Sequence, residues 1–89
     1  MPFAVIARDK PGALEIRKAN RDKHLAYLDQ TGCVTLAGPL LEEGEMTGSL
    51  LILDLPDKAA AEDWAAGDPY AQAGLFDRVE IMEWKKVVG

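Results

Sequence analysis

The sequence has little of what several large classes of protein require. Its one cysteine, Cys33, has no second cysteine for an internal disulfide, and a single histidine leaves no Cys/His cluster for zinc. Lys and Arg number 10 against 15 Asp and Glu, so the net charge of −5 disfavours nucleic acid and anionic membranes as partners. No apolar run approaches the roughly 20 residues of a membrane span, and no basic region of a signal peptide opens the chain. These absences predict a cytoplasmic protein that binds no metal, nucleic acid or membrane.

The length leaves room for one domain, which we expect to span residues 1–89. The large enzyme scaffolds need roughly 200 residues or more and are excluded. With 48% hydrophobic and 28% charged residues, the composition is that of an ordinary globular chain rather than a disordered one. A domain this short buries a modest share of its surface, so a partner subunit would add much to its stability.

Glycines and prolines divide the chain into segments of distinct character. Apolar and β-branched segments predict strands over 3–8, 34–41, 48–55 and 76–88, and segments rich in helix formers predict helices over 13–31 and 58–66. Asp57 is expected to cap the second helix, and Asp68 to cap a short helical turn that begins at Pro69. The predicted order is β-α-β-β-α-β.

This order predicts an α+β fold of the ferredoxin-like kind, with an antiparallel four-stranded sheet in the order 4-1-3-2. The first and third strands are apolar on both faces and are expected in the centre. The second strand contains Pro39 and the fourth is rich in charge, so both are expected at edges. The connection rules place both helices on one face. The other face then needs a cover, and a second copy of the chain is the simplest one, which predicts a homodimer.

The first helix carries an unusual stripe of polar side chains. A helical wheel places three leucines on the face expected to meet the sheet: Leu14, Leu25 and Leu28. Arg17 and Arg21 fall inside the same arc and His24 lies at its border, at spacings of four and three residues. Such a stripe suits a pocket for an anionic or strongly polar ligand. There are alternatives to a ligand pocket. The arginine stems could cross the apolar face to reach solvent, and the histidine could be a packing residue.

Three further residues could serve a ligand, and each also has a purely structural explanation. Asp68 could be a catalytic carboxylate or only an N-cap before Pro69. The Tyr70 hydroxyl could face a ligand, or the ring could simply pack. Ser49 could bind a ligand or cap a turn after Gly48.

Several short motifs share their order and spacing with a known family. They are Arg17-x6-His24-Leu25-x-Tyr27-Leu28, Gly38-Pro39, Gly48-Ser49, Asp68-Pro69-Tyr70 and Ala73-Gly74-Leu75. Together they resemble the YCII-related (YciI-like) family over nearly the whole chain. The resemblance implies a dimeric α+β barrel of two ferredoxin-like subunits, similar in fold to muconolactone isomerase. It also implies a small enzyme with a His–Asp active site, here His24 and Asp68. Most members have no assigned substrate, and some are associated with lyase-type dehydrochlorination in aromatic degradation.

The leading hypothesis is therefore a small-molecule enzyme of lyase or isomerase type that needs no cofactor. His24 would move a proton, Asp68 would orient its imidazole, and Arg17 or Arg21 would hold an anionic ligand, with Ser49 and Tyr70 beside it. We expect the Asp68 carboxylate within about 3.5 Å of an imidazole nitrogen. The alternatives are a non-catalytic module that binds or senses a small ligand and, by analogy of fold alone, a cofactor-free monooxygenase.

Overall fold

The computed structural model describes all 89 residues and contains four strands and three helices. In chain order they are β1 (Pro2–Asp9), α1 (Leu14–Thr31), β2 (Val34–Glu42), β3 (Glu45–Asp54), α2 (Lys58–Gly67), α3 (Pro69–Gln72) and β4 (Phe76–Glu83). The predicted order is confirmed. The largest difference lies at the last strand, which ends at Glu83 rather than Val88. The partner strand β1 begins at Pro2, and the last bond to it is from the Trp84 amide to the Pro2 carbonyl. Beyond Trp84 the tail has no strand to pair with.

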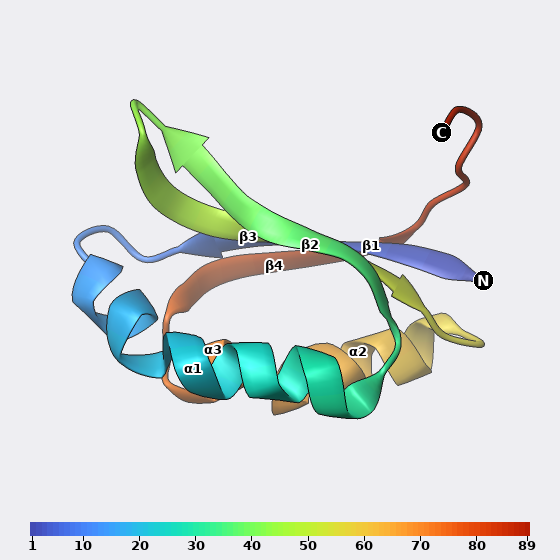
Figure 1. The fold of residues 1–89 in the computed structure, drawn as a ribbon, viewed down its shortest axis with the longest axis horizontal. Helices are drawn as coiled ribbons and strands as arrows, with labels where there is room; N and C mark the ends of the chain where they lie inside the picture. Colours follow the sequence, from blue (N-terminus) through green and yellow to red (C-terminus); the bar gives the residue numbers. More distant parts are fainter.

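The strands form one antiparallel sheet in the order β2-β3-β1-β4. This is the predicted order 4-1-3-2 read from the other edge, with the proline-containing β2 and the charged β4 at the edges. All three helices cover one face, and the other face carries no element (Figure 1). The β2–β3 hairpin and the C-terminal tail rise on the open side. The chain thus has the subunit fold of the dimeric α+β barrel proteins. None of its helices is long and apolar enough to cross a membrane.

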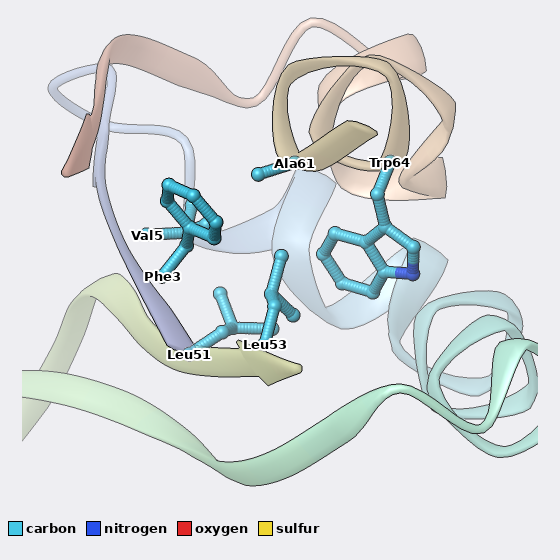
Figure 2. Packing of buried hydrophobic residues seen from close by; sticks show 6 residues of the cluster. All are labelled: Phe3, Val5, Leu51, Leu53, Ala61 and Trp64. Atoms are coloured by element: carbon cyan, nitrogen blue, oxygen red, sulfur yellow. The ribbon is translucent and has the colours of Figure 1, made fainter. Parts of the chain in front are cut away.

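The main hydrophobic core lies between the sheet and the second helix. Alternate residues of β1 and β3 point toward the helices, as the two-residue period of a strand requires, and they meet Ala61 and Trp64 of α2 (Figure 2). The cluster consists of Phe3, Val5, Leu51, Leu53, Ala61 and Trp64. The Trp64 indole nitrogen donates to the Thr31 hydroxyl at 2.9 Å, which satisfies its one polar atom and ties α2 to the end of α1.

The first helix is turned away from the orientation expected from its leucines. Its buried residues are Arg17 and His24, whereas Leu14 and Leu28 are half-buried and Leu25 is 42% exposed. The expectation that the leucine face meets the sheet is therefore confirmed only for Leu28, which packs against the core cluster. Burying an arginine and a histidine is costly unless each has partners, and other parts of the chain supply those partners.

The open face of the sheet is apolar. Strand pairing aligns Leu36, Ile52, Ala4 and Met82 in one row across it. Leu36 and Met82 are exposed, and so is Leu50 from the adjacent row at 41%. The two-sided burial expected of β3 is therefore only partial in the single chain, where Ile52 is buried but Leu50 is exposed.

Candidate functional site

A cavity of about 210 Å³ lies between the first helix and the edge of the sheet formed by β2 and β3. Its α1 wall carries Arg17, Arg21 and His24 among leucines. Across the cavity lie Pro39 of β2 and Ser49 of β3. Three predicted site residues from α1 and one from β3 therefore line a single cavity, in which polar groups converge within a largely apolar wall. This is the usual character of a small-molecule site.

His24 lines the cavity, and its imidazole contacts Asp68, which is 44 residues away in sequence. The His24 Nδ1 lies 2.8 Å from the Asp68 Oδ1, and both side chains are buried. The expected contact is confirmed. A carboxylate accepts the Nδ1 proton, so the neutral ring carries its lone pair on Nε2. Nε2 has no hydrogen-bond partner in the protein, and it is accessible from outside. It is therefore free to bind a ligand.

The contact depends on how the two helices are joined. Asp68 lies at the junction of α2 and α3, where its Oδ1 also accepts the amide of Tyr70 at 2.9 Å. The Tyr27 hydroxyl of α1 donates to the carbonyl of Trp64 at 2.8 Å, which holds the end of α2 against α1. A Cβ at Gly67 would lie 2.6 Å from that hydroxyl, so glycine permits the approach. Asp68 is thus both the predicted N-cap and the partner of His24, through one oxygen.

Arg17 lines the cavity as expected, but its charge is already paired within the protein. Its Nε and one terminal nitrogen bind the two oxygens of Asp9 at 2.7 and 2.8 Å, and the same terminal nitrogen donates to the Ser49 Oγ at 3.0 Å. Burial alone would lower the pKa of Arg17, but the bonds to the Asp9 carboxylate raise it above its ordinary value, so the guanidinium stays charged. Because Asp9 neutralises that charge, Arg17 is poorly placed as the main anion holder.

Tyr70 fills the space between the two polar groups of α1. Its ring stacks on the His24 imidazole, with centroids 3.9 Å apart and planes 13° from parallel, and the Arg17 guanidinium carbon lies 4.7 Å from its centroid. Burial raises the pKa of the Tyr70 hydroxyl, although Arg17 and Arg21 act in the opposite direction. The hydroxyl therefore stays protonated at neutral pH. The Tyr70 ring does pack, and the residue that it packs against is the site histidine. Tyr70 also lines the cavity.

One cationic residue of the site, Arg21, was expected from the sequence, and one acidic residue, Asp9, was not. Arg21 is exposed, lines the cavity and forms no ion pair with the protein, so it is the cation available to a ligand. Asp9 was not expected in the site at all. The sequence could have indicated Asp9, because Phe3, Val5 and Ala7 point toward the helices and the same alternation places position 9 on that face.

The arrangement can accept and return a proton. His24 offers Nε2 to a ligand, Asp68 stabilises the imidazolium that would form, and Arg21 offers a positive charge. No group of three or more His, Cys, Asp or Glu side chains is placed to hold a metal ion.

Comparison with known sequences relates the whole chain to one domain family. The family model described as YCII-related domain matches residues 1–85. An uncharacterized protein of Haemophilus influenzae is 38% identical, over 98% of this chain and 99% of its own length. The protein YciI of Escherichia coli O6:H1 is 34% identical over the same shares.

The solved structures that match include a neighbour that is similar in sequence as well as in fold. It is the 5-chloro-2-hydroxyhydroquinone dehydrochlorinase TftG of Burkholderia phenoliruptrix AC1100, in complex with 2,5-dihydroxybenzoquinone. Its TM-score is 0.89 at 34% identity, covering 96% of this chain and 94% of that one. The cofactor-independent oxygenase SnoaB of Streptomyces nogalater matches with a TM-score of 0.61 at 15% identity, over 98% and 95% of the two chains. The second likeness concerns the fold alone.

Proposed function

This chain belongs to the YCII-related domain family, and we propose that it is a small-molecule enzyme in which the His24–Asp68 pair moves a proton on a bound hydroxyquinone or a related enol. The observation that carries the proposal is the 2.8 Å contact between the two buried side chains, with the second imidazole nitrogen unpartnered at a cavity wall. The likeness to a dehydrochlorinase at 34% identity supports a lyase-type reaction in particular.

The chemistry can be written with this chain's residues. His24 accepts a hydroxyl proton from a chlorinated hydroxyhydroquinone and returns it to the carbon that bears chlorine, which yields the keto tautomer. Removal of a second hydroxyl proton and departure of chloride from that carbon complete the loss of HCl and leave a hydroxybenzoquinone. Chloride leaves with the electron pair of the carbon–chlorine bond, so the ring reaches the quinone level without an external oxidant. Asp68 stabilises the transient imidazolium, and Arg21 faces the negative charge on the ring oxygens.

The direct test is chloride release from 5-chloro-2-hydroxyhydroquinone under argon, with buffer alone as the blank. Argon matters because hydroxyhydroquinones react with oxygen without an enzyme. We expect release by the wild-type protein and a fall of about 10²–10⁴-fold in His24→Gln, the range for loss of a general acid–base. Release no faster than the blank, or equal release by His24→Gln, would contradict the proposal. Tight binding without turnover would favour the alternative, a binding module.

We also propose that two copies pair through their open sheet faces. Leu36, Leu50 and Met82 are exposed there, and nothing in the chain covers them. A face this apolar is stabilised when a second copy covers it. Light scattering should give twice the chain mass of 9.7 kDa. Leu50→Glu should shift the protein toward the monomer, because it places a charge in the middle of this face. A stable wild-type monomer at micromolar concentration would refute the pairing.

A further inference from the structure

The buried hydroxyl of Ser49 has a hydrogen that the protein does not use. Ser49 is 3% exposed and its Oγ accepts a hydrogen bond from Arg17 at 3.0 Å, but the hydroxyl donates to no protein acceptor. A hydroxyl that accepts one bond still has its proton to donate. Buried donors in native proteins almost always find an acceptor, and Ser49 lines the cavity that His24 also lines.

The direction of the hydroxyl is set by a rigid group behind it. The Arg17 terminal nitrogen that donates to Ser49 is also bound to Asp9, and the side chains of Arg17 and Asp9 are 3% and 6% exposed. Two bonds to a planar carboxylate fix the guanidinium in place. A guanidinium has no acceptor atom, so the Ser49 proton cannot turn toward it. The proton is therefore left facing the cavity.

The same contact strengthens Ser49 as a donor. Arg17 stays charged, and a hydroxyl that accepts a bond from a cation donates a stronger one. Such a donor suits a carbonyl or phenolate oxygen, which accepts in a single direction and gains charge as a neighbouring proton leaves. An arginine that binds a carboxylate ligand would present two of its nitrogens to that ligand. Here the Nε and one terminal nitrogen of Arg17 are already bound to Asp9.

We infer that Ser49 donates a hydrogen bond to an acceptor oxygen of the substrate, and that Arg17 and Asp9 act through it as positioning residues. The inference rests on the proposed function and names the group that would hold its enol or hydroxyquinone substrate, by a carbonyl or phenolate oxygen close to the proton that His24 moves. A simple carboxylate ligand would not use this group.

The test compares Ser49→Ala with Thr47→Ala, using 2,5-dihydroxybenzoquinone as the probe and its visible absorbance as the signal. Thr47 lies two residues away on β3 and lines a different cavity, so its variant removes a hydroxyl outside the site. We expect Ser49→Ala to weaken binding about 10-fold or more, the loss typical of a hydrogen bond to a charged group. Thr47→Ala should bind like the wild type, and melting temperatures should show that both variants are folded.

A merely structural Ser49 is separated from a donor by the pH dependence of binding. If Ser49 donates to an ionised oxygen, Ser49→Ala should raise the pH at which the bound quinone loses its proton, as its absorbance reports. Ser49→Thr, which keeps the hydroxyl, should restore the wild-type profile. Equal affinity and an equal pH profile in Ser49→Ala would overturn the inference, and the proposed function would stand if His24→Gln still abolished chloride release. A wild-type protein that neither binds the quinone nor releases chloride would overturn both.

Discussion

The layer between the helices and the sheet has two ends of opposite character. At one end six apolar side chains from β1, β3 and α2 pack together, with Trp64 and Leu53 among them (Figure 2). At the other end a network of polar groups is buried beside a smaller apolar cluster of Ala13, Tyr70 and Leu75. The polar groups are Asp9, Arg17, Ser49, His24 and Asp68. Leu51 belongs to the apolar cluster and also lines the cavity, so the two ends adjoin.

The difference separates what holds the fold together from what the site requires. Apolar burial stabilises the fold without demanding one precise orientation of each group. Buried charges cost free energy, and here each is compensated by a specific partner. No side-chain nitrogen or oxygen that is fully shielded from solvent lacks a hydrogen-bond partner. A protein that needed only stability would gain as much from leucines at the polar end. We therefore expect substitutions at the apolar end to change stability first, and those around His24 to change chemistry first.

The largest effect on stability is expected from Leu53→Ala. Leu53 is fully buried in the apolar cluster, so its truncation leaves a cavity and should lower the free energy of unfolding by about 3–5 kcal/mol. Leu25→Ala is the matched control, because Leu25 is 42% exposed and should lose less than about 1 kcal/mol. Urea denaturation measures both. Equal losses would show that the apolar end does not dominate the stability.

Arg17→Met should cost nearly as much, for an electrostatic reason. It leaves the Asp9 carboxylate buried without its partner and should lower the free energy of unfolding by about 3 kcal/mol. The double variant Arg17→Met/Asp9→Leu removes both charges and should lose less than Arg17→Met alone. A double variant that loses the sum of the two single losses would show that the pair is not coupled.

The smallest effect concerns the two tyrosines at high pH. Burial raises the pKa of both Tyr27 and Tyr70 above the ordinary value of 10.0. The folded state therefore holds these protons more tightly than the unfolded state, and stability should fall as the pH rises from about 10 through the raised values. Below that window their contribution is fully present. An absorbance titration showing tyrosinate with a midpoint at 10 in the folded protein would contradict this.

The sequence predicted the fold because most strands and helices are bounded by a local signal, such as Gly32 after α1 or Pro69 at the start of α3. The end of β4 at Glu83 has no such signal and was not predicted. It also predicted the contact between His24 and Asp68, through topology and the resemblance to a family. The orientation of α1 could not be predicted in this way. A helical wheel ranks Leu25 above Arg17 for burial, but Asp9 and Ser49, which are distant from each other in sequence, reverse that order by supplying partners.

The role of Asp68 tests the account most directly, because this residue serves both the fold and the site. Asn caps a helix as well as Asp does, so Asp68→Asn should change the free energy of unfolding by less than about 0.5 kcal/mol. An amide cannot stabilise the imidazolium as a carboxylate does, and chloride release should fall by about 10²–10⁴-fold. The measurement is the rate of chloride release by Asp68→Asn beside its urea denaturation curve. A stable variant with little activity is the predicted result, and a variant that releases chloride at the wild-type rate would contradict a catalytic His24–Asp68 pair.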